Sequence, residues 1–416
     1  MPPQSSERRR LDPTFLFLVS FFAFLCLGGL SLWISGHGYS DPMAINLLHR
    51  SCAAAAGPDT LLRHVASSYP QIPFLFQAVV SWIPGFGAHL PVNLLSALCA
   101  SLLLGWLYLE ICRLASPFRA VFWTLLIAAH PFFLWAATSS LTATLALCGF
   151  LVLAKAVLCI ARWADARSFL TFSFILTVCM FSWDGGLVLF LLLLLFFPVF
   201  LPSEIRHSSV WGGYISAFLI PLSAIACSLY TDWVFGKSAT LFTTLRNSLV
   251  RPDFSAFVHS SHLPMIFVIV PLLSAPLALS PLFSFSQLRG IEKRTMLLCY
   301  CIPSVLLFTG MVSFIPAHQM ETLALFAGLS GAALVGFLRI HKNAPTLCTL
   351  LLLAAVLGGC ATLKLFPLPE MQAWLAALRG EKGISSVYEA VSLLPWLVSA
   401  SALFAASIGA AILRRP

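Results

Sequence analysis

Long runs of apolar residues, nearly free of charge, recur along the whole chain. The first covers residues 14–35 and contains no Asp, Glu, Lys or Arg. A helix needs about 20 apolar residues to span the hydrocarbon of a bilayer. Only 9% of the 416 residues are charged, whereas a soluble protein carries about 25%. This composition leaves too little polar surface for a water-exposed globule, so the sequence predicts an all-α integral membrane protein.

Twelve segments have the length and composition of membrane helices. They lie near residues 14–35, 92–112, 119–137, 139–161, 168–183, 186–201, 209–229, 263–286, 295–315, 319–338, 345–365 and 390–413. Two of them, 168–183 and 186–201, are short and closely spaced, so they could also be counted as one. The chain shows no repeat, no low-complexity tract and no soluble domain.

The basic residues predict the orientation of the helices. "ERRR" precedes the first segment and favours a cytoplasmic N-terminus. Alternation then places fifteen Lys and Arg on the cytoplasmic side and eight on the other. The net charge is +9, but the basic residues are scattered singly between apolar runs, so the charge does not indicate nucleic-acid binding. We expect a multi-pass protein of the inner membrane with both termini in the cytoplasm. Cleavage of a signal peptide is a less favoured alternative, because "AAAA" at 53–56 lies far beyond the apolar stretch.

Three loops fall on the non-cytoplasmic side: 36–91, 230–262 and 366–389. In the first, residues 73–87 are apolar but too short to span, and prolines bound them. This pattern indicates a helix lying in the interface, with Trp82 at headgroup depth.

Asp41 stands just after the first segment, in "SGHGYSDPMAINLLHRSC". An Asp followed by Pro is typical of a helix cap, so the sequence predicts a short helix starting at Pro42. A carboxylate fixed at the membrane surface can also serve as a general base for a hydroxyl. Both roles are compatible at one position.

Polar neighbours of Asp41 are candidate substrate-binding residues. His37 and His49 flank it, His64 follows, and Arg50 lies next to His49; of these, His37 and Arg50 are the substrate-binding candidates. Histidines near a carboxylate can hold a divalent metal, but their spacing matches no established motif and loop histidines are often only solvated. The twelve cysteines lie mostly inside apolar runs, so we expect neither a structural disulfide nor a thiolate metal site.

The second loop combines cations with aromatic residues. "GKS" at 236–238 is not a P-loop, because the position five before its glycine is a threonine. Cations beside aromatic side chains at a membrane surface suit a lipid phosphate that carries a sugar. The competing interpretation is ordinary anchoring at the interface. The cations of this loop are Lys237, Arg246 and Arg251.

Two further acids, Asp184 and Glu321, fall near the outer ends of helices and could join a cleft there. The remaining segments carry few ionisable groups. Glu110 and Lys155 lie near cytoplasmic ends, where they could snorkel to the interface. Ion-coupled transporters usually carry titratable residues near the midplane.

This layout resembles the GT-C superfamily of membrane glycosyltransferases, which includes protein mannosyltransferases and aminoarabinose transferases. The resembling features are Asp41 in "GYSDP", Tyr69-Pro70 ahead of the interfacial helix, "FSWDGGLVLFLLLLLF" and "DWVFGKSATLF". They cover roughly residues 10–260, the expected catalytic module, while 261–416 would add membrane helices. Two features depart from the family: Asp41 has no second acid beside it, and no soluble C-terminal domain follows.

The resemblance implies an inverting transferase on the extracytoplasmic face. Its donor would be a polyprenyl-phosphate sugar, and its acceptor a lipid, glycan or protein hydroxyl. Asp41 would be the base, and Tyr69 would join the substrate-binding residues. No cofactor is implied, although a divalent metal stays open. A transporter or lipid flippase, and a non-catalytic scaffold, are the alternatives.

Overall fold

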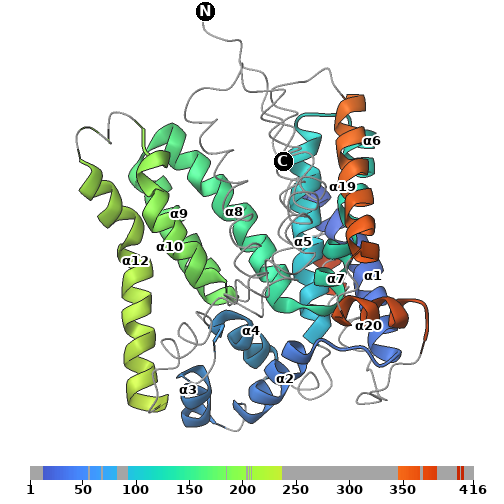
Figure 1. Ribbon diagram of the computed structural model, residues 1–416, viewed down its shortest axis with the longest axis horizontal. Helices are drawn as coiled ribbons and strands as arrows, with labels where there is room; N and C mark the ends of the chain where they lie inside the picture. The colour runs from blue at the N-terminus through green and yellow to red at the C-terminus, as the bar shows by residue number, and fades with distance from the viewer. Residues whose placement is uncertain are drawn as a thin grey trace, which may run out of the picture.

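The computed structural model describes residues 13–54, 57–66, 69–81, 92–183, 185–202, 205, 207, 209–236, 345–365, 369–381, 401–402 and 404–406. Within these residues the chain is almost entirely helical, and none of them lies in a β-strand. The helices pack side by side as a bundle (Figure 1). The predicted all-α class is therefore confirmed for the described part of the chain.

The described elements are almost all α-helices. They are α1 (Pro13–Gly36), α2 (Pro42–Ala54), α3 (Pro58–Ala66), α4 (Gln71–Ser81), α5 (Val92–Cys112), α6 (Pro117–Ala128), α7 (Pro131–Ser139), α8 (Leu141–Trp163), α9 (Ala166–Ser182), α10 (Gly186–Phe200), α12 (Val210–Thr231), the π-helix η1 (Asp232–Gly236), α19 (Pro345–Leu365) and α20 (Pro369–Leu378). Seven of these begin at a proline. Proline suits a first helical position, because the N–H that it lacks would have no partner there.

Three of the described helices are long and apolar enough to cross a membrane: Thr14–Gly36, Asn93–Cys112 and Val210–Phe235. The shorter apolar helices α8, α9, α10 and α19 coincide with other segments expected from the sequence. The described part therefore has the character of a membrane protein. The expected segments 263–286, 295–315 and 319–338 lie outside the described residues, as does most of 390–413.

The expected continuous helix over 119–137 is wrong. The chain forms two helices instead, α6 and α7, whose axes meet at 73°. Pro131 explains the break: it has no N–H to continue the α6 ladder, and its ring pushes the preceding residue out of the helical region. His130 accordingly has an extended backbone, with φ −63° and ψ 125°. If the bent pair counts as one span, four spans are described.

The first and fifth helices pack closely along their length (Figure 1). Gly105 of α5 lies against α1, where an added Cβ would stand 2.9 Å from the carbonyl oxygen of Leu16. Small residues allow such close approach of backbones inside membranes. The α1–α5 pair thus forms a tightly packed centre to which α7 and α8 attach.

Two ends of the bundle can be distinguished. One, here called the α2–α4 end, carries α2, α3 and α4 beneath the ends of α1, α9 and α12 (Figure 1). The opposite end carries the turn between α5 and α6 and the turn between α8 and α9. Among the described residues, Arg50 lies in α2 and Arg63 in α3, at the α2–α4 end, whereas Arg113 follows α5 and Arg167 lies at the start of α9. The orientation of the two ends relative to a membrane stays a prediction.

Candidate functional site

The turn after α1 reverses the chain in a few residues. The N–H of Gly38 donates to the Ser35 carbonyl at 3.0 Å, and that of Tyr39 to the Ile34 carbonyl at 3.3 Å. Gly38 has a φ of 84°, which glycine adopts without strain. This pair of bonds is a Schellman cap. It ends α1 at a fixed place and directs the chain straight into Asp41.

Asp41 is held on its other side by the start of α2. Its carbonyl accepts from the N–H of Ile45 at 3.0 Å, as expected of a residue that caps a helix. Pro42 opens the helix, so the predicted cap and short helix are confirmed. Asp41 itself is only 7% exposed. Asp41 is therefore a buried acid whose backbone lies between the end of α1 and the start of α2, beside an N-terminus that favours negative charge.

Several buried polar side chains lie on the helices of the α2–α4 end and of the bundle above it. Ser96 of α5 donates to the Ala136 carbonyl at 2.6 Å and lies 2.8 Å from the Thr144 hydroxyl. Asn93 donates to Ser35 at 3.2 Å. The other buried polar residues at this end include Ser51, Gln77, Thr138, Ser139, Ser140, Thr142, Ser182 and Ser228.

Among these buried polar residues, Gln77 has an unusual environment. It lies on α4, is 0% exposed, and neither atom of its amide has a hydrogen-bond partner among the described residues. A buried polar group without a partner costs free energy. This amide therefore has hydrogen bonds to offer to a ligand or to another part of the chain.

Tyr69 ties the first loop to the bundle. Its hydroxyl lies 2.7 Å from the Met180 carbonyl and 3.4 Å from the Trp183 carbonyl, at the end of α9. Gln71 donates to the Ser228 hydroxyl at 3.0 Å. The turn leading into α4 is therefore anchored to both α9 and α12. A helix, α4, covers part of the expected segment 73–87: it starts two residues earlier, and residues 82–87, Trp82 among them, lie outside the described residues. Its position in a membrane interface stays a prediction.

His37 and Arg50 lie on either side of Asp41 along the chain. The Nδ1–H of His37 donates to the Trp33 carbonyl at 2.8 Å, and its ring packs 4.2 Å from that of Trp33. Arg50 follows Asp41 by nine residues, about 13 Å along the helix axis. The ring of His37 is thus held against α1, and Arg50 marks the far half of α2.

Other predicted site residues lie outside the described residues: Asp184, Lys237, Arg246, Arg251 and Glu321. Their binding roles stay predictions. Among the described residues, no three His, Cys, Asp or Glu side chains gather closely enough to hold a metal ion.

Asp232 is a candidate that the sequence analysis missed. It is 1% exposed and opens the π-helix η1, which packs against α3. Single π-helical turns occur frequently at functional sites. Asp232 follows Ser228 by one helical turn, so both lie on the face toward Gln71. The sequence feature that could have predicted Asp232 is an acid directly after an apolar helix, which is also the position of Asp41.

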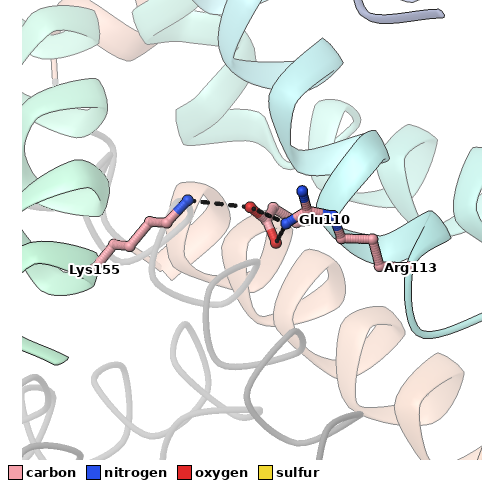
Figure 2. Close-up of polar contacts among 3 residues, drawn as sticks. All are labelled: Glu110, Arg113 and Lys155. Carbon is pink, nitrogen blue, oxygen red and sulfur yellow. Dashed lines mark hydrogen bonds and ion pairs between the residues drawn. The ribbon is translucent and has the colours of Figure 1, made fainter. Parts of the chain in front are cut away.

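At the opposite end, Glu110 and Lys155 do not follow the expected pattern. Glu110 is 3% exposed and does not snorkel. Figure 2 shows its carboxylate between Arg113 and Lys155, with ion-pair distances of 3.1 and 3.2 Å. Lys155 reaches back from α8 because a charge so close to the hydrocarbon needs a partner.

His130 was overlooked because it is isolated in an apolar run. It lies at the break between α6 and α7 and is 1% exposed. No described residue bonds either ring nitrogen with hydrogen-bond geometry, although the backbone of Ala355 faces the ring. A buried ionisable group thus occurs inside a helical region that was expected to hold few.

No family model, no curated protein and no solved structure matches this chain. The resemblance to the GT-C superfamily therefore rests on the residue pattern alone.

Proposed function

We propose that this chain is a membrane glycosyltransferase acting at the α2–α4 end of the bundle. The observation that supports the proposal is the placement of Asp41, a buried acid at the junction of α1 and α2. A general base must be held in one direction within hydrogen-bond reach of the hydroxyl that it deprotonates. The end of α1 and the start of α2 provide that constraint together.

In the proposed reaction, Asp41 takes the proton of an acceptor hydroxyl. The acceptor oxygen forms a bond to the anomeric carbon of a sugar held as a polyprenyl-phosphate donor. The bond from that carbon to the phosphate oxygen breaks, and polyprenyl phosphate leaves with the electron pair. Attack from the opposite face inverts the sugar carbon. Lys237, Arg246 and Arg251 are proposed to stabilise the charge that develops on the phosphate.

The test is transfer by Asp41→Asn, with Asp165→Asn as a matched control. Both residues begin a helix, at opposite ends of the bundle, and Asn caps about as well as Asp. Only Asp41→Asn removes the proposed proton acceptor. We expect its transfer rate to fall by about 10²–10⁴-fold, the usual contribution of general base catalysis, while Asp165→Asn transfers normally.

The measurement is the mass of envelope glycans in cells that lack the native gene and carry each variant. Loss of a single sugar with Asp41→Asn, at unchanged protein level, supports the proposal. Normal glycans with a well-folded Asp41→Asn protein would leave Asp41 only as a cap, and the search for the base would move to Asp232, Asp184 or Glu321.

Transport is the second candidate function, and the break between α6 and α7 is the observation that favours it. Interrupted helices near buried polar groups form the binding sites of many transporters, and His130 lies at the 73° break between α6 and α7. A transporter predicts loss of a whole polymer or accumulation of its precursor, where a transferase predicts loss of one sugar. In that case His130→Leu abolishes activity and Asp41→Asn does not.

A further inference from the structure

Three charged residues meet where α5 and α8 cross. Arg113 lies just after α5, and its Nη1 donates to both carboxylate oxygens of Glu110 at 3.2 and 3.1 Å. The ammonium of Lys155, from α8, donates to Glu110 Oε1 at 3.2 Å (Figure 2). It also lies 5.2 Å from the centre of the Trp106 ring. The carboxylate and the indole thus fix the lysine in one position.

The charges of this cluster do not balance. A single cation would neutralise Glu110, and among the described residues two cations lie within ion-pair distance of it. The carboxylate side chain is 4% exposed, whereas those of Arg113 and Lys155 are 39% and 51% exposed. The surplus positive charge therefore faces outward, with N–H groups of both cations beyond those used on Glu110.

The position of the cluster matches the depth of lipid headgroups. Exposed aromatic side chains mark this end of the bundle: Phe118 is 83% exposed, Trp163 72% and Trp211 80%. Such side chains favour the boundary between lipid and water. Lys155 precedes Trp163 by eight residues, about 12 Å along α8, and its long side chain shortens that distance. Val152, on the same face of α8, is 39% exposed and offers apolar surface next to the cation.

We infer that Arg113 and Lys155 form a binding site for the phosphate of an anionic lipid. The headgroup phosphate accepts hydrogen bonds from both cations, and the acyl chain extends from them along the apolar surface of α8. Glu110 serves as the buried counter-charge that holds the two cations in place. Basic pockets between membrane helices recognise anionic headgroups in this way. The site is independent of the proposed transferase, because it lies at the opposite end of the bundle.

Native mass spectrometry of the purified protein, titrated with phosphatidylglycerol or phosphatidylcholine, tests the inference. We expect tighter binding of phosphatidylglycerol. Each cation near a membrane surface contributes roughly a fivefold change in affinity. Arg113→Gln and Lys155→Gln should each weaken phosphatidylglycerol binding by about that factor, and the double variant by about thirtyfold, with phosphatidylcholine binding unchanged.

Two controls separate the site from general surface charge and from misfolding. Arg167→Gln removes an exposed cation at the same end but outside the cluster, and should bind both lipids like the native protein. Lys155→Arg keeps the charge and should keep the lipid preference. If either Gln variant fails to fold, lipid binding by the remaining single variant and by Lys155→Arg tests the inference.

Equal binding of the two lipids by the native protein would overturn the inference, as would an unchanged preference in the double variant. Inorganic phosphate provides the last arm. At concentrations equal to those of the lipid it should not displace phosphatidylglycerol, because it lacks the acyl chain. Displacement at equal concentration would assign the site to a soluble phosphate compound instead.

Discussion

At Gly105 the backbones of α1 and α5 approach more closely than a side chain would allow. A Cβ there would lie 2.9 Å from the Leu16 carbonyl oxygen and would also collide with Ser20. Ser20 can rotate away, but the carbonyl belongs to the α1 ladder and cannot move without breaking it. Because apolar side chains gain nothing by leaving lipid for one another, such close packing is what holds membrane helices together.

We therefore expect Gly105→Ala to destabilise the protein by about 1–3 kcal/mol, the usual cost of overpacking. Gly29→Ala is the matched control, since it adds the same methyl group to α1 where nothing lies within 4 Å. Thermal unfolding in detergent, followed by tryptophan fluorescence, measures both. If the two variants melt together, the α1–α5 contact is not as tight as the geometry indicates.

At the scale of helices, capping residues decide where several elements begin. Asp165 caps α9: its Oδ1 accepts from the Ser168 N–H at 2.9 Å and also from the Ser168 hydroxyl. These hydrogen bonds favour the ionised form and hold the pKa of Asp165 below its ordinary value of 3.8. The carboxylate consequently contributes stability above pH 3.8, and loses that contribution as the pH falls through the lower, folded-state pKa.

Asp165→Ala should therefore melt at a lower temperature than the native protein near neutral pH. The difference should shrink as the pH drops below 3.8. Scanning calorimetry or fluorescence melting between pH 3 and pH 7 follows the change. A difference that stays constant over this range would show that the charge of Asp165 plays no part in the cap.

The helices differ in how easily they can be predicted from the sequence. The helices α1, α5 and α12 were predicted to within two residues, because long apolar runs have few alternative structures. The break at Pro131 was missed, since a proline in a membrane helix can bend it or end it, and neighbouring helices decide which. The helices α3 and α20 were missed because each is short and lies in a polar loop.

The residues of the candidate site also differ in how well the sequence predicts them. Asp41 could be found because a cap and its proline are adjacent in sequence. The Glu110–Lys155 pair joins residues 45 positions apart, and the Tyr69 hydroxyl bonds a carbonyl 111 positions away. Contacts of that range depend on how helices cross, which local patterns do not encode.

The whole molecule has two chemically distinct ends. The α2–α4 end holds a buried polar interior with Asp41 and Asp232, and the opposite end holds the Glu110 cluster with exposed aromatic side chains. The basic residues of the sequence predict that the α2–α4 end lies outside the cell.

Labelling of introduced cysteines tests that orientation. Asn46→Cys lies on the exposed face of α2, and Ala166→Cys at the start of α9. In intact cells a membrane-impermeant maleimide should label position 46, and it should reach position 166 only after permeabilisation. Labelling of both positions in intact cells would refute the two-sided arrangement and the proposed face of the active site.

The two hydrogen bonds of Thr138 bear on the order in which the helices come together during synthesis. The Ser31 hydroxyl donates to its carbonyl at 3.1 Å, and the indole N–H of Trp374 donates to its hydroxyl at 3.0 Å. One buried residue of α7 thus joins positions near the two ends of the chain. The ribosome releases residue 31 long before residue 374, so the early helices must wait in the membrane with this junction incomplete. The hydrogen bond from Trp374 in α20 to Thr138 therefore forms only after α1 and α7 have been synthesised.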